Sequence, residues 1–536
     1  MSFRCFKGER ELAVRVTYSD DVRKKLQTGI DKLADIVKVT LGPMGRNVLI
    51  QRKDGPPLVI NDGATIVKDI ELSDFTENMG ARVIREVALK ANEASGDGTT
   101  TAIVLAQQIV QQSFRNIAAG ADPMMMKKGI QNATQLAVAA IKKQSVPVRS
   151  HLEIAQVASL SAQDKQLGEL IAEAIGQVGG DGISIRESGT MRTELRIEKG
   201  MQFDRGFLIP QMADDSRKMV SELMNPFILV TDKRISGSRE LIPLMEKLAP
   251  LGSPLLIVAE GIEGEALGLL MENRLRGVLN TVAVHPPAYG EGRVARMEDL
   301  ALLTGGVFFS ENTGYPNLSD ATPDMLGRAV SVRIERHNTV VGGSAGKAED
   351  IEQRIRYLKI LHDRSKYEFD RQQLTERIAK LGRGVAFIDV GAPTLVEMKE
   401  RKLRGEDALN AAKAAIGQGV VSGGGAAYLR CIPALKAYAD TLSDDKKIGV
   451  QIIIGALKAP ASQIAENAGL NGVDVVARTV KKPAGFGFDA LKEEYVNMFE
   501  AGIVDPALVT CLALQSASSA AAALISSEAG VTATGK

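Results

Sequence analysis

The glycine-rich segment 96–101, Gly-Asp-Gly-Thr-Thr-Thr, constrains the fold of this chain more than any other stretch does. Glycine has no Cβ atom, so the backbone beside Asp97 can adopt positive φ and approach a bulky anion closely. An apolar helical run begins at Ala102, and a helix N-terminus offers free N–H groups and a positive dipole to phosphate. Asp97 would then be a natural ligand for the Mg²⁺ that accompanies a nucleotide. A helix capped after a glycine turn explains the same residues equally well.

A second glycine loop, TLGPMGRNV at residues 40–48, follows residues 22–39, whose apolar side chains have helical spacing. The helix is expected to end near Gly42, because the residue before a proline avoids the α region. This loop is either an ordinary turn into a strand at residues 48–50 or a second backbone cradle for phosphate. A third element places the carboxylate of Asp62 on a tight turn, and a simple β-turn is the alternative there.

Length and charge exclude several classes of protein. A chain of 536 residues is too long for one hydrophobic core, so three or four domains are expected. The formal net charge is +1, which gives no support to binding of nucleic acid or of a membrane surface. Cys5, Cys431 and Cys511 are far apart, which suits a reducing compartment and gives no metal-ligand spacing. The N-terminus lacks the apolar core of a secretory signal, so a cytoplasmic location is expected.

The spacing of apolar residues changes twice along the chain. To about residue 141 most of the sequence has helical spacing, and Asp122 followed by proline is a good helix start. Short apolar strands at residues 226–230 and 254–258 then alternate with helical runs, which predicts an α/β domain with a mainly parallel sheet. Further helices are expected at residues 167–178, 241–248, 265–274, 351–361, 374–381, 409–416, 450–464 and 509–525.

Several motifs occur in the order and spacing of one known family. They are TLGPMGRNV at residues 40–48, NDG at 61–63, GDGTTT at 96–101, EDAL at 406–409 and SGGG at 422–425. From about Tyr18 to Ser527 the sequence resembles the chaperonins, and it is most similar to the bacterial-type, group I members (the GroEL class). The segment 200–206, Gly-Met-Gln-Phe-Asp-Arg-Gly, favours that group over the archaeal and eukaryotic cytosolic one.

The resemblance implies a multidomain α/β chaperonin fold. A mostly helical equatorial domain that binds ATP would comprise residues 1–143 and 418–536. A small intermediate hinge domain would comprise residues 144–199 and 386–417. An α/β apical domain that binds client proteins would comprise residues 200–385.

The resemblance also assigns a nucleotide site. Asp97 would bind Mg²⁺, and Thr40 and Thr100 would help to hold a monovalent cation, expected to be K⁺. Asp62 and the distant Asp407 would position and polarise the attacking water, and closure of the intermediate domain would bring Asp407 near. Without the resemblance, an acid favourable to a helix dipole is the simpler interpretation of Asp407. The residues expected to contact ATP are Thr40, Leu41, Gly42, Pro43, Asn61, Asp97, Gly98, Thr99, Thr100, Thr101, Gly424, Asp489, Ala490, Ile503 and Asp505.

Two of these positions depart from the family pattern. Asn61 stands where the family usually has a lysine, and Asp489 stands where it usually has an asparagine. The first change removes a cation from the surroundings of the phosphates. The acids of the site are all present, so an active ATPase is expected.

The client surface is also implied by resemblance, since exposed apolar patches on a soluble protein usually mark binding sites. The residues expected to contact clients are Phe207, Met212, Ile242, Met245, Leu267 and Met271. From their spacing alone, helix packing is the simpler explanation of most of these side chains. Gln211 and Glu272 make the rim of this surface more polar than is common in the family.

The resulting expectation is an ATP-dependent folding chaperone that holds unfolded clients, closes under a small co-chaperonin lid and forms sevenfold rings, stacked in pairs. A chaperonin-like holdase with weak ATPase activity is the alternative, and Asn61 and the polar rim favour it. A small-molecule kinase would need an acceptor site, for which the sequence has no motif. A P-loop is absent because Ala348 follows Gly346-Lys347 where a hydroxyl residue is required.

Overall fold

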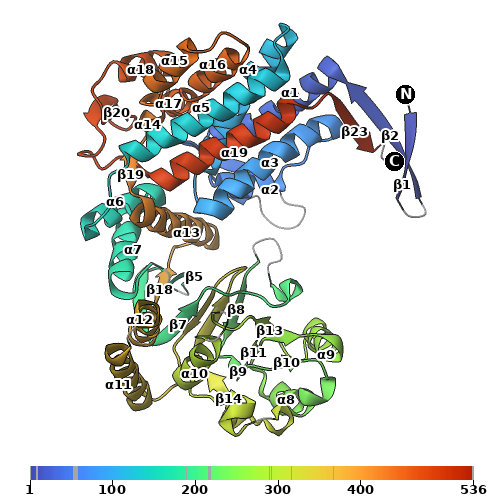
Figure 1. Ribbon diagram of the computed structural model, residues 1–536, viewed down its shortest axis with the longest axis vertical. Helices are drawn as coiled ribbons and strands as arrows, with labels where there is room; N and C mark the ends of the chain where they lie inside the picture. The colour runs from blue at the N-terminus through green and yellow to red at the C-terminus, as the bar shows by residue number, and fades with distance from the viewer. Residues whose placement is uncertain are drawn as a thin grey trace. The chain divides into compact units, whose positions relative to one another are not determined.

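The structure is a computed structural model that describes residues 2–7, 10–51, 58–180, 182–188, 190–214, 219–288, 290, 292–315, 317–365 and 367–533 (Figure 1). The chain divides into two compact units. Unit 1 comprises Met1–Ala172, Gly189–Met191 and Gly391–Lys536, and unit 2 comprises Glu173–Ser188 and Arg192–Val390. The division into three domains stays a prediction.

Unit 1 is mostly helical. Its helices are α1 (Ser19–Lys38), α2 (Gly63–Asp69), α3 (Phe75–Ser95), α4 (Thr99–Ala118), α5 (Pro123–Gln144), α6 (His151–Ala162), α13 (Leu395–Gln418), α14 (Ala426–Leu429), α15 (Ile432–Asp440), α16 (Lys446–Ala456), α17 (Ala459–Asn467), α18 (Gly472–Val480) and α19 (Ala507–Ile525). Short two-stranded pieces join them: β3 (Val48–Ile50) with β4 (Leu58–Ile60), β19 (Val420–Ser422) with β22 (Val504–Pro506), and β20 (Phe486–Asp489) with β21 (Glu494–Asn497).

The core of unit 1 lies where the long helices α4, α5 and α19 run beside one another (Figure 1). Ile103, Ile130 and Leu514, one from each helix, are fully buried in this core. The segment Lys446–Asn467 and the helix Ala507–Ile525 are apolar and long enough to cross a membrane, but half or more of each is buried within the structure. Burial in a helical core therefore accounts for their composition.

Both ends of the described chain meet in one sheet. The strands β1 (Ser2–Lys7) and β2 (Arg10–Tyr18) form an antiparallel hairpin, and β23 (Ala529–Ala533) pairs with the other edge of β2 (Figure 1). Tyr18 lies opposite Ala529 in this register. Neither the hairpin nor β23 was expected from the spacing of apolar residues.

Among its described residues, unit 2 contains three larger sheets and a two-stranded one, β10 (Arg234–Ile235) with β12 (Gly261–Ile262). A mainly parallel sheet has the order β13 (Thr281–Val284), β11 (Leu255–Val258), β9 (Phe227–Thr231) and β14 (Phe308–Phe309), with β15 (Gly327–Arg328) antiparallel to β9. An antiparallel sheet has the order β7 (Gly200–Phe203), β17 (Thr339–Gly342), β16 (Ser331–Ile334) and β8 (Ser221–Met224). The third sheet has the order β5 (Ile183–Glu187), β18 (Val385–Val390) and β6 (Glu194–Glu198). The predicted parallel α/β sheet is confirmed.

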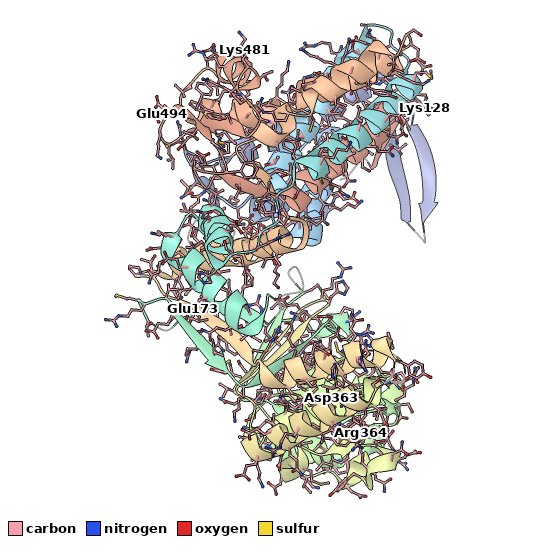
Figure 2. All side chains as sticks on the ribbon, turned by 60° about the vertical axis from the view of Figure 1, so that its left-hand side comes forward. Lys128, Glu173, Asp363, Arg364, Lys481 and Glu494 are labelled. Atoms are coloured by element: carbon pink, nitrogen blue, oxygen red, sulfur yellow. The ribbon has the colours of Figure 1, made fainter. Side chains whose placement is uncertain are left out.

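Helices flank these sheets, and the boundary between the two units falls within α7 (Lys165–Val178). The helices of unit 2 are α8 (Ile242–Leu248), α9 (Gly264–Leu275), α10 (Gly292–Thr304), α11 (Ala348–Arg364) and α12 (Glu368–Gly382). Charged side chains such as Asp363 and Arg364 at the end of α11 and Lys128 on α5 are exposed (Figure 2). This distribution fits the period of 3.6 residues that predicted the helices.

One predicted helix is wrong in its extent. Residues 450–464 were expected to form a continuous helix, but the structure has two, α16 and α17, separated by Leu457 and Lys458. Pro460 lies in the first turn of α17, where its missing N–H needs no partner. A proline inside one long helix would have removed a hydrogen bond, so the chain breaks before it. The helix start at Asp122 is confirmed, because its side chain accepts hydrogen bonds from Met124 N and Met125 N.

Candidate functional site

The first glycine loop leaves α1 as an ordered turn. Thr40 Oγ1 donates a hydrogen bond to the Val37 carbonyl at 2.8 Å and lies 3.4 Å from Thr100 Oγ1. Gly42 has φ of +83°, and Asn467 Nδ2 donates to the Leu41 carbonyl at 2.8 Å. The loop is therefore fixed from outside by α17, with positive φ at the residue that has no Cβ atom.

The NDG motif forms a helix start rather than a simple β-turn. Asp62 is the N-cap of α2: Oδ1 accepts from Ala64 N, and Oδ2 accepts from Thr65 N, both at 2.9 Å. Thr65 Oγ1 adds a third hydrogen bond at 2.6 Å. A Cβ atom on Gly63 would lie 2.6 Å from Thr100 Oγ1, so the glycine lets α2 approach the third motif.

The segment 96–101 connects α3 to α4 through two glycines with positive φ. Gly96 ends α3 with φ of +68°, and Gly98 is the N-cap of α4 with φ of +84°. A Cβ atom on Gly98 would lie 2.6 Å from Val509 Cγ1. The side chain of Asp97 accepts from Gly98 N at 2.5 Å and from Ser161 Oγ at 3.5 Å. The N-terminus of α4 thus lies next to a carboxylate, as the phosphate hypothesis requires.

Helix α13 supplies the fourth part of the site. Glu400, Leu403, Arg404 and Asp407 are spaced by three or four residues, so they share one face of the helix. Arg404 Nη2 donates to Glu400 Oε1 at 2.7 Å along this face.

These elements enclose one cavity of about 170 Å³ within unit 1. The residues that line it are Thr40, Leu41, Gly42, Ile60, Asn61, Asp62, Gly63, Asn92, Asp97, Gly98, Thr99, Thr100, Thr101, Ser161, Gln163, Glu400, Leu403, Arg404 and Asp407. Ligand pockets usually measure about 300–1,000 Å³, so this space fits a polyphosphate group rather than a whole nucleotide. The structure therefore brings Asp62, Asp97 and Asp407 to one cavity, although Asp407 is far from the others in sequence.

The electrostatics of the cavity favour a bound cation. Burial raises the pKa of the Asp97 carboxyl; the Gly98 N–H lowers it, and the charge of Asp62 raises it further. Burial also raises the pKa of Asp505 to about 7, and the charge of Asp97 adds to this effect. Carboxylates that repel one another in a buried place are stabilised by a cation between them. The position of Asp97 thus suits the role of a Mg²⁺ ligand.

Protein side chains alone do not form the metal site. Among the described residues, no group of three or more His, Cys, Asp or Glu side chains is placed to hold a metal ion. Mg²⁺ in nucleotide sites commonly uses one or two carboxylates and completes its coordination with phosphate and water oxygens. The residues present fit that type of site.

The remaining nucleotide-contact predictions lie outside the cavity lining: Pro43, Gly424, Asp489, Ala490, Ile503 and Asp505. Asp505 lies opposite Val421 in the β19–β22 pair, and Gly423 N donates to the Ile503 carbonyl at 3.0 Å. The Asp489 side chain accepts from Leu491 N and Lys492 N within its own hairpin. These residues stay predicted ribose and adenine contacts.

The predicted client-binding residues divide into two groups in unit 2. Phe207, Met212 and Met245 are buried in its core, with at most 6% of their surface exposed. Ile242, Leu267 and Met271 are partly exposed on α8 and α9. Burial of the first group agrees with the packing interpretation, and the client-binding role of all six stays a prediction.

Sequence reasoning missed several lining residues, of which Arg404 is the most informative. It is the cationic side chain among the described residues that line the cavity, and its Nε atom is buried without a hydrogen-bond partner. The signal was its position one helical turn before Asp407, on the same face of α13. No sequence motif marked the other missed residues, which include Asn92, Ser161, Gln163 and Glu400.

A carboxylate-lined cavity between glycine turns and helix N-termini is the kind of site that binds phosphate groups together with a cation. The chain belongs to the TCP-1/cpn60 chaperonin family, since the model of this family matches residues 33–533. It is accordingly an ATP-dependent molecular chaperone of non-native proteins.

A solved structure supports the fold. The crystal structure of the chaperonin gp146 from the bacteriophage EL 2 (Pseudomonas aeruginosa), determined in the presence of ATP-BeFx, resembles this chain with a TM-score of 0.67. The two sequences are 20% identical, and the match covers 97% of this chain and 99% of the phage protein. The predicted chaperonin fold is confirmed.

Proposed function

We propose that this chain hydrolyses ATP in the cavity of unit 1 and uses the hydrolysis to drive cycles of client binding and folding. The observation that carries the proposal is the meeting of Asp62, Asp97 and Asp407 with two glycine turns in one cavity. Phosphoryl transfer to water needs charge neutralisation and positioning rather than covalent chemistry, and these residues provide both.

The residues of the cavity have separate roles in this proposal. The backbone of residues 98–101, at the N-terminus of α4, and Gly42 of the first glycine loop line the cavity and cradle the phosphates. Asp97 holds Mg²⁺, which neutralises phosphate charge when it is bound. Thr40 and Thr100, whose hydroxyl oxygens are 3.4 Å apart, offer oxygen ligands to K⁺.

Asp62 and Asp407 orient the attacking water. Asp62 is held by three hydrogen bonds from Ala64 and Thr65, so its position is fixed before the substrate arrives. Asp407 lies on α13, far along the chain from Asp62 and Asp97. Any displacement of that helix would change the position of the attacking water. Hydrolysis is thereby sensitive to conformation.

The assembly belongs to the same proposal. Sevenfold rings, stacked in pairs, would hold clients on Ile242, Leu267 and Met271 and close under a small co-chaperonin lid in the cytoplasm. Nucleotide can drive such closure only through different affinities for the two states. Electron microscopy of the full chain with ATP tests ring number and symmetry directly.

The sharpest test of the chemistry is Asp407→Ala. Loss of a group that activates water should reduce turnover by about 10²–10⁴-fold, while ADP binding stays close to that of the unchanged protein. The measurement is steady-state phosphate release, with ADP affinity from calorimetry. Glu397→Ala, which removes the same charge from an exposed position on α13 outside the cavity lining, is the matched control. Unchanged turnover in Asp407→Ala would refute the assignment.

A holdase with weak ATPase activity is the second candidate. The observation in its favour is that Asn61, where the family usually has lysine, lines the cavity itself. Refolding of a denatured client separates the two: the proposal expects ATP and a lid protein to raise the yield, and a holdase would suppress aggregation equally without ATP.

A further inference from the structure

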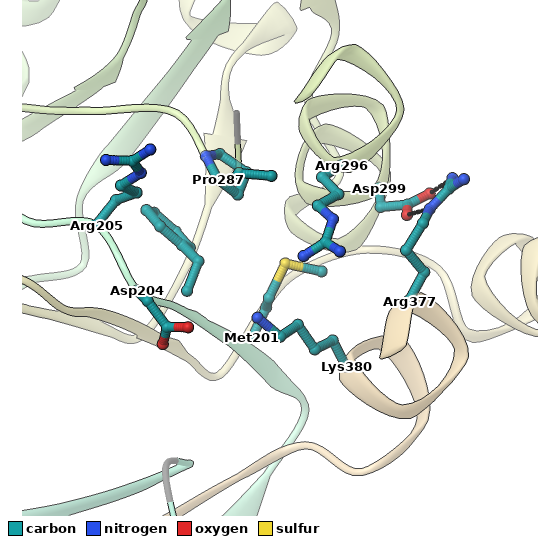
Figure 3. A pocket seen from close by; sticks show the side chains of 10 residues that line it. Met201, Asp204, Arg205, Pro287, Arg296, Asp299, Arg377 and Lys380 are labelled. Carbon is teal, nitrogen blue, oxygen red and sulfur yellow. Dashed lines mark hydrogen bonds and ion pairs between the residues drawn. The ribbon is translucent and has the colours of Figure 1, made fainter. Parts of the chain in front are cut away.

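A second cavity lies within unit 2. Its volume is about 170 Å³, and its lining comes from β7 and the loop after it, the loop before α10, and the helices α10 and α12 (Figure 3). The lining residues are Met201, Phe203, Asp204, Arg205, Pro287, Ala288, Arg296, Asp299, Arg377 and Lys380. Four of these side chains are cationic and two are acidic.

One acid and one arginine already form a structural ion pair. Asp299 is 1% exposed, and its two oxygens accept from Arg377 Nε at 2.7 Å and from Arg354 Nε at 2.8 Å. Figure 3 shows Arg377 turned toward Asp299. This pair fixes α12 against α10 and leaves Asp299 no charge to offer a ligand.

Arg296 and Lys380 retain donors that the protein does not satisfy. Arg296 Nη2 donates to Gln373 Oε1 at 2.5 Å and to Glu376 Oε2 at 2.6 Å, but its Nε atom is buried without a partner. Lys380 makes no hydrogen bond or ion pair with the residues that the structure describes. Both cationic groups lie beside Met201 in Figure 3. A buried donor without a partner is costly, and a ligand oxygen would remove that cost.

The surroundings of Arg296 and Lys380 favour binding of a negatively charged ligand. Met201, Phe203 and Pro287 give the cavity an apolar side, where charge interactions are stronger than in water. Burial lowers the pKa of His285, which follows β13, and the positive charge of Arg205 lowers it further.

We propose that this cavity binds a small oxyanion of the phosphate or carboxylate class, with Arg296 and Lys380 as its hydrogen-bond donors. Phosphate and carboxylate groups both present oxygens in the geometry that guanidinium and ammonium groups prefer. The volume accommodates a small anion, and the attraction between the cationic donors and the anion is stronger beside the apolar side than in water. The site is separate from ATP hydrolysis, because unit 2 alone lines it.

Binding to the full chain tests the proposal. Saturating ADP with Mg²⁺ first fills the cavity of unit 1; inorganic phosphate and succinate are then titrated separately by calorimetry, which distinguishes the two sources of oxyanion. Lys380→Gln should weaken binding about tenfold or more, the effect of one hydrogen bond to a charged group. Lys380→Arg should retain most of the affinity.

Lys359→Gln is the matched control, since it removes the same charge from an exposed position on α11 of the same unit. Binding of either anion to the unchanged protein, lost in Lys380→Gln and kept in Lys359→Gln, supports the site. Failure of both anions to bind, or equal weakening by the two glutamine variants, would overturn it. Circular dichroism of Lys380→Gln confirms that the loss is not unfolding.

Discussion

Arg404 is the residue whose placement changes the interpretation of the nucleotide cavity most. The lining carries the carboxylates Asp62, Asp97, Glu400 and Asp407, and Arg404 is the cation among the described lining residues. Asn61 cannot supply the charge that lysine provides elsewhere in the family. Arg404 is therefore suited to the additional negative charge of a triphosphate over a diphosphate.

We predict that Arg404→Ala weakens ATP binding by about 10- to 100-fold and affects ADP much less, because one charged hydrogen-bond partner is lost. Calorimetric titration with a non-hydrolysed ATP analogue and with ADP measures both affinities. Arg401→Ala is the control: Arg401 lies on the same helix but binds Asp164 Oδ2 at 2.7 Å and the Gly391 carbonyl at 2.8 Å. Equal effects of the two substitutions would contradict the role of Arg404.

Asp505 makes the stability of the nucleotide-free protein depend on pH. Its pKa is raised from 3.8 to about 7, so the folded state holds the proton more tightly than the unfolded chain does. The stability that this proton contributes is present below about pH 4 and is lost as the pH rises to 7. Asp505→Asn should therefore raise the melting temperature at pH 8 and leave it nearly unchanged at pH 4.

Calorimetry in EDTA without nucleotide checks this prediction. Asp74→Asn is the contrasting variant, because the hydrogen bond from Lys25 lowers the pKa of Asp74 to about 2. Its contribution is present above about pH 4 and is lost as the pH falls through 2, so this variant should lower the melting temperature at pH 8. A decrease at pH 8 in Asp505→Asn would show that burial does not disfavour its charge.

Local motifs and distant partners differ in how far the sequence reveals them. Gly42, Gly96 and Gly98 could be identified because positive φ and close approach leave few residue choices. Arg404 could not, because its importance depends on packing of α13 beside residues some three hundred positions earlier. The turn at Asp489 was also hidden, since no motif indicated that its side chain accepts hydrogen bonds from Leu491 N and Lys492 N.

At the scale of elements, the contact of α5 with α16 depends on two glycines. A Cβ atom on Gly129 would lie 2.1 Å from the Lys446 carbonyl oxygen, and one on Gly449 would lie 2.2 Å from the Met126 carbonyl oxygen. The helix backbones therefore touch directly. Apolar spacing predicted both helices but could not predict that they cross at glycine.

Gly449→Ala should lower the free energy of unfolding of unit 1 by about 1–3 kcal/mol or more, because the helices must separate to admit the methyl group. Gly417→Ala in α13, where nothing lies within 4 Å of the added Cβ, is the control and should stabilise by about 0.5–1 kcal/mol. Urea denaturation followed by circular dichroism measures both. Similar free energies of unfolding in the two variants would mean that α5 and α16 can move apart at no cost to admit the methyl group.

The same limit applies to segment boundaries. Residues 450–464 had continuous helical spacing, and Pro460 was the available sign of a break. The strands β1, β2 and β23 were not predicted, because no turn motif marked the β1–β2 hairpin and because β23 pairs with β2 from the other end of the chain. Helices of local origin were recognised, whereas sheet partners remote in sequence were not.

At the scale of the whole molecule, the two units should respond differently to nucleotide. Every lining residue of the first cavity belongs to unit 1. A ligand that binds only the folded state stabilises it by RT ln(1 + [L]/Kd), about 2.7 kcal/mol at a hundredfold excess over Kd.

We predict that ADP with Mg²⁺ slows hydrogen exchange in Met1–Ala172 and Gly391–Lys536 and leaves Arg192–Val390 largely unchanged at the level of the core strands. Mass spectrometry of the full chain reports each segment separately. Asp97→Ala, which removes the proposed metal ligand, should abolish the protection in unit 1. Equal protection of both units would show that nucleotide stabilises the chain as one cooperative body.

Unit 1 is built from both ends of the chain, which has a consequence for biosynthesis. Its helices α1–α6 leave the ribosome early, but α19 and β23, which complete its core and its terminal sheet, are translated only after the whole of unit 2. Unit 2 is nearly continuous, so the nascent chain can finish it while unit 1 still exposes unpaired apolar helices. A protein that rescues other polypeptides therefore passes through a vulnerable interval of its own during translation.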